Sequence, residues 1–446
     1  MFSVQGDAIG GFCDGVSRRN FLKVGAMGLG FGGLCLPDML KLQAAQKNSS
    51  PTYKAVINLH LEGGPPQMDT FDMKPDSSLE LRGEFNPIRT KVPGTHICEL
   101  LPNLANLADK FTIIRSVVGN VNKHNYDTTQ IGYPGLDLPK PAMRSIGGAP
   151  SIGGVISKIL GGRDGMPAFV WDKTGGSQEE VQNGWLGPRY APFDPKVSPA
   201  NFKATIPEAR LHDRMGLLGI IDNVKRTIDN SHKMEVVDQY TNEAVDMVLS
   251  GKIAEAMDLS GESPKTRSKY IDGIPEKWRG QTERLMLARR LVEAGARYVS
   301  LNWGGYLGFD SHDNNYPKMR SILPPFDISL AALITDLYER GLDKDVLVVV
   351  WGEFGRTPIV NEKAGRDHWP QVQSALIIGG GLKMGQVIGT TDHLAGEPTE
   401  RPVHIHEIIA TIYRHCGINP LETQLIDPTG RPRYLLDYRK PIEELI

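Results

Sequence analysis

Val346-Leu347-Val348-Val349-Val350-Trp351-Gly352-Glu353-Phe354-Gly355-Arg356-Thr357 says most about the architecture of this chain. Its first five residues form a continuous apolar run, which is typical of a strand buried on both faces of a parallel sheet. Two ionisable residues, Glu353 and Arg356, come soon after this strand. Binding sites of open α/β sheets form just beyond the carboxyl ends of such strands. The stretch therefore predicts an α/β protein with a polar site at this sheet edge.

Two further segments carry side chains that suit a divalent cation. They are Phe309-Asp310-Ser311-His312, which follows a predicted strand at 297–303, and Arg366-Asp367-His368-Trp369. Carboxylate and neutral imidazole are common ligands of zinc, manganese and iron. Loops that follow parallel strands meet at one sheet edge, so Asp310, His312 and His368 are expected within roughly 5 Å of a common point. The sequence thus predicts a metal site built from these three residues.

Apolar strands alternate with amphipathic helices along most of the chain. This alternation predicts a mostly parallel sheet with helices on both faces. Long charged stretches between 201 and 273, where Pro and Gly are scarce, predict a helical insertion or cap. The expected strands are 54–61, 111–118, 167–171, 297–303, 346–351 and 374–379, and the expected helices are 150–161, 283–295, 327–341 and 401–416.

Composition bounds the class of protein. A chain of 446 residues, 40% hydrophobic and 23% charged, can hold one large α/β domain with insertions. Its formal net charge of −2 provides no basic field, so we expect no nucleic-acid partner. Cys98 and Cys416 are the cysteines beyond the first 45 residues, and whether they pair is left open by the sequence.

The first 45 residues resemble an export signal rather than a part of the fold. The segment contains a paired-arginine motif, Ser17-Arg18-Arg19-Asn20-Phe21-Leu22-Lys23. A weakly apolar stretch at 24–36 follows, and then Ala44-Ala45. This pattern is typical of a bacterial twin-arginine signal peptide. We therefore expect the twin-arginine translocase as a partner and a periplasmic or secreted protein. The apolar stretch is shorter than the roughly 20 residues of a membrane span, and no later segment qualifies.

The order of these segments resembles the alkaline phosphatase-like superfamily, which includes sulfatases and phosphodiesterases. Within it, the segments 63–75 and 353–358 resemble a bacterial family known as domain of unknown function 1501. The resemblance covers about 50–435, apart from the helical insertion. It implies an alkaline phosphatase-like domain with an early-strand metal carboxylate, for which Asp69 is preferred over Glu62. It also places a nucleophile between 122 and 129, where Thr128 and Thr129 carry the aliphatic hydroxyls.

The resemblance implies a metal-dependent hydrolase of phosphate or sulfate esters. The expected cofactor is a divalent metal, zinc first, with manganese or calcium as alternatives. The expected substrate is a small anionic ester or a sulfated or phosphorylated glycan. The chain beyond the signal has no Cys/Ser-x-Pro-x-Arg segment, so the formylglycine of sulfatases is absent. Because Glu353-Phe354 also replaces the Asp-His pair of a second metal, the alternative is a non-catalytic secreted binding or assembly protein.

Three roles stay open at this point. Glu353 is either a metal ligand or the ion-pair partner of Arg356 across a turn. Arg356 binds an oxyanion of the substrate, or it pairs with Glu353 or Asp367. His124 neutralises charge on the substrate, or it is a polar group of its loop.

Overall fold

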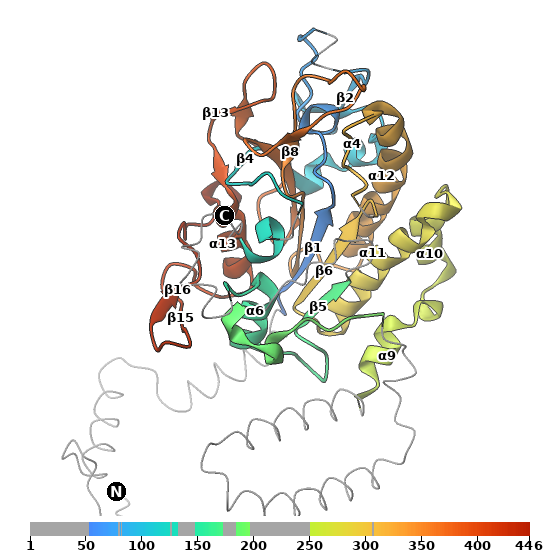
Figure 1. Ribbon diagram of the computed structural model, residues 1–446. Helices are drawn as coiled ribbons and strands as arrows, with labels where there is room; N and C mark the ends of the chain where they lie inside the picture. Colours follow the sequence, from blue (N-terminus) through green and yellow to red (C-terminus); the bar gives the residue numbers. More distant parts are fainter. Residues whose placement is uncertain are drawn as a thin grey trace, which may run out of the picture. The chain divides into compact units, whose positions relative to one another are not determined.

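The computed structural model describes residues 53–78, 81, 83–124, 127–132, 148–172, 184–196, 250–305 and 307–446. Within them, eight strands form one central sheet, whose middle lies between helices on both sides (Figure 1). Its order is β11 (Val387–Ile388), β4 (Phe111–Val118), β10 (Gln373–Gly379), β7 (Val346–Trp351), β1 (Ala55–Leu61), β6 (Tyr298–Trp303) and β5 (Phe169–Asp172), and β14 (Val403–His404) also pairs with β4.

Apolar burial explains why β1 and β7 form the middle of this sheet. Every residue of both strands is buried, and β1 lies parallel to both β6 and β7. Each Val or Leu side chain removed from water contributes about 1.5–3 kcal/mol. The six strands expected from the sequence are present, and the mostly parallel α/β architecture is confirmed.

One strand, β10, runs antiparallel to its neighbours β4 and β7. Between β7 and β10 the chain forms a small hairpin from β8 (Gly355–Arg356) and β9 (His368–Trp369) instead of a crossover helix. The chain therefore re-enters the sheet from the edge at which it left, and β10 must run in the opposite direction. The apolar pattern of 374–379 predicts the strand but not its direction.

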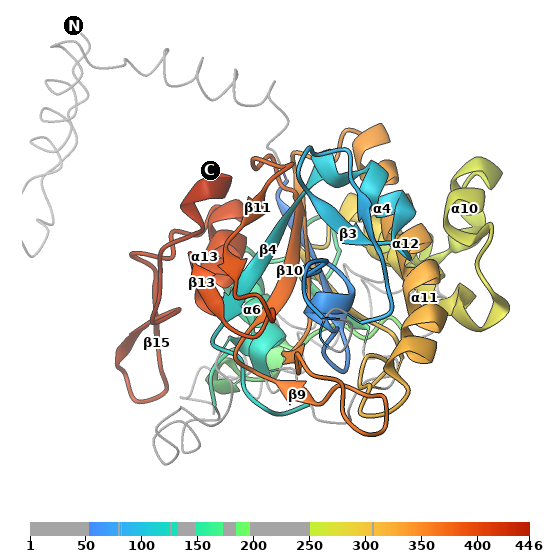
Figure 2. The same cartoon turned by 90° about the horizontal axis from the view of Figure 1, so that it is seen from above.

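Helices cover the sheet on both faces (Figures 1 and 2). On one side lie α6 (Ile152–Leu160) and α13 (Ile405–His415), and on the other lie α4 (Pro102–Asn106), α11 (Glu276–Ala294) and α12 (Asn315–Glu339). The α6 helix begins as expected, because the Ser151 hydroxyl accepts a hydrogen bond from Gly154 N at 3.1 Å. Both predicted helices of the second side begin earlier in the structure than in the sequence analysis.

The early start of α12 has a physical reason. Pro324 and Pro325 lie inside this helix, and prolines there remove backbone donors at about 3 kcal/mol each. The helix expected from the sequence begins only at 327, after both prolines. Burial of most of one face of α12 overrides this local penalty.

Several expectations fall wholly or partly outside the described residues. The signal at 1–45 and residues 201–249 of the expected insertion are among them. The described remainder of the insertion is helical, with α9 (Lys252–Met257) and α10 (Pro264–Ile271). Cys98 and Cys416 are both buried free thiols. Among the described residues, no helix has the length and apolarity needed to cross a bilayer.

Candidate metal centre

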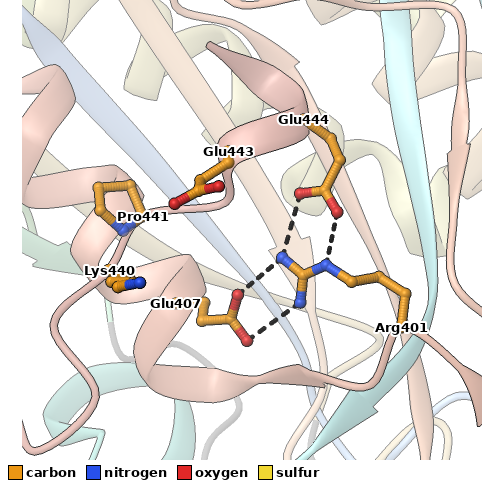
Figure 3. Close-up of a pocket in the computed structure, with 6 residues that line it drawn as sticks. All are labelled: Arg401, Glu407, Lys440, Pro441, Glu443 and Glu444. Carbon is orange, nitrogen blue, oxygen red and sulfur yellow. Dashed lines mark hydrogen bonds and ion pairs between the residues drawn. The ribbon is translucent and has the colours of Figure 1, made fainter.

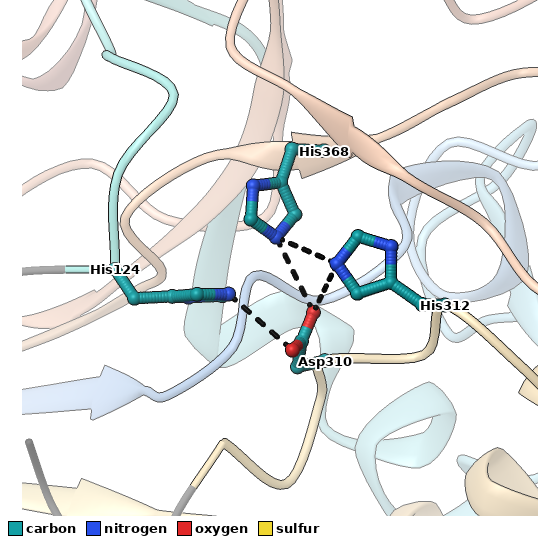
Figure 4. A group of neighbouring side chains, drawn as sticks. All are labelled: His124, Asp310, His312 and His368. Carbon is teal, nitrogen blue, oxygen red and sulfur yellow. Dashed lines mark hydrogen bonds and ion pairs between the residues drawn. The ribbon is translucent and has the colours of Figure 1, made fainter.

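Three segments at the carboxyl edge of the sheet bring one group of side chains together (Figure 4). Asp310 and His312 come from the loop after β6, His368 from β9, and His124 from the loop after β4. The loop after β1 passes tightly beneath them at Gly63, whose φ is +104°. A Cβ on Gly63 would lie 2.3 Å from the backbone nitrogen of Asp310, so only glycine allows this approach.

The four side chains converge on the carboxylate of Asp310. Their candidate ligand atoms all lie within 4.8 Å of one another. The Oδ1 atom of Asp310 is 3.1 Å from His312 Nε2 and 3.3 Å from His368 Nε2. Its Oδ2 atom is 3.4 Å from His124 Nε2. The expected convergence of Asp310, His312 and His368 therefore has a counterpart in the structure, with His124 as a fourth member.

Every imidazole of the cluster is held from behind through its other nitrogen. The Nδ1 atoms lie 2.7 Å from Glu353 Oε1 for His124, 2.5 Å from Asp367 Oδ1 for His312, and 2.7 Å from Asn122 Oδ1 for His368. Each oxygen accepts a hydrogen bond from Nδ1, so the Nε2 atom of each ring faces the cluster and can offer its lone pair to a cation once it carries no proton. Such outer contacts are the usual support of metal-binding histidines.

The donor set fits a divalent cation. His312 Nε2 and His368 Nε2 are 3.0 Å apart, and two nitrogens so close need a shared proton or a shared cation. Ligand nitrogens about 2.0–2.1 Å from a tetrahedral zinc ion lie about 3.3 Å from each other. Three imidazoles and one carboxylate are also a chemically suitable set for zinc or manganese. The residues that would hold the ion are Asp310, His312, His368 and His124.

The neighbours of Asp310 stabilise the ionised form of its carboxyl group. Burial alone would raise the pKa of its carboxyl, but hydrogen bonds from His124, His368 and Arg356 outweigh burial and hold the pKa well below its usual range. Burial alone would lower the pKa of His124, but its contacts with Asp310 and Glu353 raise that pKa to about 9. The carboxylate is thus kept ionised, as a metal ligand must be.

Arg356 differs from the expectation that it binds a substrate oxyanion. Its side chain is fully buried, and it donates hydrogen bonds to the backbone carbonyls of Gly63, Gly64 and Arg366. It also donates to Asp310 Oδ1 at 2.6 Å. A guanidinium enclosed in this way fixes the Asp310 carboxylate instead of facing a substrate. Its carboxylate partner is Asp310, and not Glu353 or Asp367 as considered from the sequence.

Glu353 and Asp69 lie outside the group of converging atoms. Glu353 is 1% exposed, and its Oε1 accepts from Gly63 N at 2.9 Å and from His124, so it supports a ligand from behind. Asp69 is fully buried, where Arg366 Nε at 2.8 Å and Asn315 Nδ2 at 2.7 Å donate to its Oδ2. The Asp69 carboxylate is therefore committed to a separate buried ion pair.

The two candidate nucleophiles are inside the protein. Thr128 and Thr129 are fully buried on the helical turn η3 (Asp127–Ile131). The Thr129 hydroxyl is 2.9 Å from His60 Nδ1, and the Thr128 hydroxyl has no hydrogen-bond partner in the described structure. Neither hydroxyl is hydrogen-bonded to a member of the metal cluster. This placement disfavours direct attack by a threonine on a substrate.

A separate hollow lies beside the start of α13 (Figure 3). Its volume is about 550 Å³. The cationic side chain of Arg401 lines it and is the group to consider for anion binding. Glu407 and Glu444 each place both carboxylate oxygens against its guanidinium, which satisfies its charge. The hollow is therefore a poor site for a phosphate or sulfate group. It is lined by Arg401, Glu407, Lys440, Pro441, Glu443 and Glu444.

Fold and site together define an α/β protein with a candidate centre of three histidines and one aspartate. The model of the family "Protein of unknown function (DUF1501)" matches residues 53–446, and the chain belongs to this family. No curated protein matches its sequence.

Solved structures with partial similarity include alkaline phosphatase-like enzymes. The PsFucS1 sulfatase from Pseudoalteromonas sp. is 12% identical, with 84% of this chain and 70% of that chain covered and a TM-score of 0.38. A TAB5 alkaline phosphatase mutant with bound Mg is 10% identical, with 82% and 99% covered and a TM-score of 0.36. The phosphonate monoester hydrolase from Silicibacter pomeroyi is 11% identical, with 83% and 74% covered and a TM-score of 0.34. Scores in this range assign neither substrate nor mechanism.

Proposed function

We propose that this protein is an exported, metal-dependent hydrolase of phosphate or sulfate esters that works without a formylglycine. One observation carries the proposal. Three imidazole Nε2 atoms meet at the Asp310 carboxylate, and each imidazole is fixed by an acceptor at its Nδ1. Preorganised ligands of this kind are the first requirement of metal-assisted hydrolysis.

A bound divalent cation would supply a Lewis acid for the ester oxygen and for an attacking water. The chain's own residues keep the site charged and open. Arg356 anchors Asp310, whereas the side chain of His312 is 48% exposed, so one side of the cluster faces solvent. Because the hydroxyls of Thr128 and Thr129 are buried and hydrogen-bond to no member of the cluster, we favour direct attack by water over a threonine nucleophile.

Substrate and location follow from the same proposal. A cationic centre open to solvent suits a small anionic ester or the sulfate or phosphate group of a glycan. The twin-arginine pattern at 17–23 supports export to the periplasm or beyond, with the translocase as a transient partner.

The proposal is tested with protein purified from a host in which it is exported. We expect turnover of at least one phosphate or sulfate ester from a broad panel, dependent on added zinc, manganese or calcium. His368→Ala removes a ligand and should abolish turnover while the protein stays folded. The matched control is His96→Ala, at an exposed position of β3 (His96–Cys98). Absence of turnover across the panel with all three metals would contradict a hydrolase.

One observation favours a second candidate, a secreted binding or assembly protein. Structural zinc sites are closed by four protein ligands, whereas catalytic ones keep an open position with three. Four protein donors converge here. A six-coordinate ion such as manganese would still keep two positions for water or substrate. Tight metal binding without turnover of any ester would therefore select the binding protein.

A further inference from the structure

The central strand β1 contains two polar residues on one face. Asn58 and His60 alternate along the strand, which places both side chains on the same side of the sheet, and both are buried. The Asn58 amide donates to the carbonyl oxygen of Thr129 at 3.1 Å, and His60 Nδ1 lies 2.9 Å from the Thr129 hydroxyl. Buried polar groups are costly unless paired, so these contacts fix β1 against the turn η3.

The other nitrogen of His60 faces the support of the metal cluster. His60 Nε2 is 3.4 Å from Glu353 Oε2. The other oxygen of Glu353, Oε1, accepts hydrogen bonds from Gly63 N and His124 Nδ1. Oε2 has no hydrogen-bond partner in the described structure, although Glu353 is only 1% exposed. With the Thr129 hydroxyl donating to Nδ1, the hydrogen of His60 is assigned to Nε2, whose 3.4 Å contact with this oxygen is at ion-pair distance and is not a hydrogen bond.

We propose that His60 is a positioning residue of the metal centre, which acts on the ligand His124 through Glu353. The inference rests on the metal centre of the proposed function and extends it by one layer. Thr129 fixes the ring of His60, His60 Nε2–H holds Oε2 of Glu353, and Glu353 Oε1 then accepts the Nδ1 hydrogen of His124 in a fixed direction. The Nε2 lone pair of His124 is thereby directed at the cation.

This arrangement matters because His124 lies on a loop rather than on a strand. Of the contacts around its ring, the one at Nδ1 goes to Glu353, and its Nε2 faces Asp310. Without His60, Oε2 of the buried Glu353 loses the imidazole beside it, and the carboxylate should rotate toward other donors because an unpaired charge in the interior is expensive. Loss of His60 should therefore misalign His124, although His60 never touches the metal.

The test compares His60→Leu with His60→Gln in the full chain. Leu removes the donor, whereas the Gln amide can place an N–H near the position of Nε2. The readouts are zinc affinity by competition with a chelator and the visible spectrum of the cobalt-substituted protein. We expect His60→Leu to bind zinc about tenfold more weakly with an altered cobalt spectrum, and His60→Gln to stay within about threefold of the wild type.

His415→Leu and His415→Gln are the matched controls. His415 is also a buried histidine near β1, and its Nε2 lies 3.0 Å from Ala55 O, but it has no contact with the cluster. Both control variants should lower the urea midpoint and leave zinc affinity and the cobalt spectrum unchanged. A loss of zinc affinity in the controls equal to that in His60→Leu would overturn the inference, because it would show a general effect of destabilisation.

Thr129→Val decides the question if His60→Leu does not fold. This change keeps the side-chain volume and removes the hydroxyl that fixes His60, so zinc binding should weaken severalfold. Wild-type zinc affinity in Thr129→Val would then overturn the inference. Wild-type zinc affinity in a folded His60→Leu would overturn it as well, while leaving the metal centre intact. If the wild type itself takes up no metal, the proposed function fails, which is a distinguishable result.

Discussion

At the scale of single residues, each ligand of the cluster has a partner behind it. Glu353, Asp367 and Asn122 accept the Nδ1 hydrogens of the three histidines, and Arg356 holds Asp310. Loss of such an outer partner commonly weakens metal binding 10- to 100-fold. We therefore expect metal binding at this site to depend on residues that never contact the ion.

Asp367→Ala tests the partner of His312. Without its acceptor, the half-exposed imidazole can rotate and populate the wrong tautomer, so zinc affinity should fall about tenfold. The measurement is a chelator competition at fixed pH. The matched control is Asp313→Ala. Asp313 is an exposed carboxylate in the loop that carries His312, and it pairs with Lys318. Equal affinity of wild type and Asp367→Ala would refute the assigned role.

Arg356→Lys tests the anchor of Asp310. A lysine has three N–H donors and cannot satisfy three carbonyls and a carboxylate at once, and each buried acceptor left without a donor costs about 1–3 kcal/mol. We expect lower stability in urea and weaker zinc binding together. Arg289→Lys disturbs another buried arginine, paired with Glu262 and Asp336, and should lower stability alone. Unchanged zinc affinity in Arg356→Lys would show that Asp310 needs no anchor.

The sequence predicts some, but not all, of the residues of this site. Asp310, His312 and His368 could be proposed because each histidine has an aspartate one or two positions before it. His124 has no such neighbour, and the only signal for it was its place after a strand that ends at the same sheet edge. The hydrogen-bond partners of Arg356 and Glu353 lie on loops that are far apart in sequence. No local sequence pattern predicts these partners.

At the scale of elements, the strands were predictable and their connections less so. Short apolar runs such as 346–350, rich in β-branched residues and too short for a typical helix, favour buried strands. The direction of β10 depends on the β8–β9 hairpin, whose strands of two residues carry no periodic signal. The start of α12 depends on tertiary packing around Pro324 and Pro325, which outweighs local propensity.

His415, the last residue of α13, predicts how stability depends on pH. Burial lowers the pKa of His415 to about 4, against about 6.5 in the unfolded chain. The unfolded state therefore takes up the proton first, so stability is full above about pH 6.5 and falls by roughly 3 kcal/mol as the pH drops to about 4. Urea unfolding at pH 7 and pH 5 should show this loss. His415→Gln should reduce it, whereas exposed His96→Gln should not; an identical pH dependence in wild type and His415→Gln would contradict the assignment.

At the scale of the whole molecule, the family match begins at residue 53, after the segment that we interpret as an export signal. The candidate ligands come from three segments far apart in sequence, so we expect the metal centre to form only when the sheet is complete. Export in a folded state would allow the ion to be bound before translocation, which is a physical reason to combine this site with a twin-arginine signal.

Replacing Arg18 and Arg19 together by lysine tests the export proposal. The twin-arginine pair is the recognised feature of the signal, so the precursor should stay in the cytoplasm at full length. Cell fractionation and the mass of the protein give the answer. Arg89→Lys, at an exposed position of the folded part, should be exported normally. Normal export of the double variant would exclude a twin-arginine signal.

The metal content of the purified protein tests the central claim most directly. Wild-type protein from an exporting host, dialysed without chelator, should contain about one equivalent of a divalent metal, as expected of a single cluster of four ligands. His368→Ala, still folded by circular dichroism, should contain almost none. Wild-type protein that holds no metal, even after separate incubation with zinc, manganese and calcium, would contradict the account.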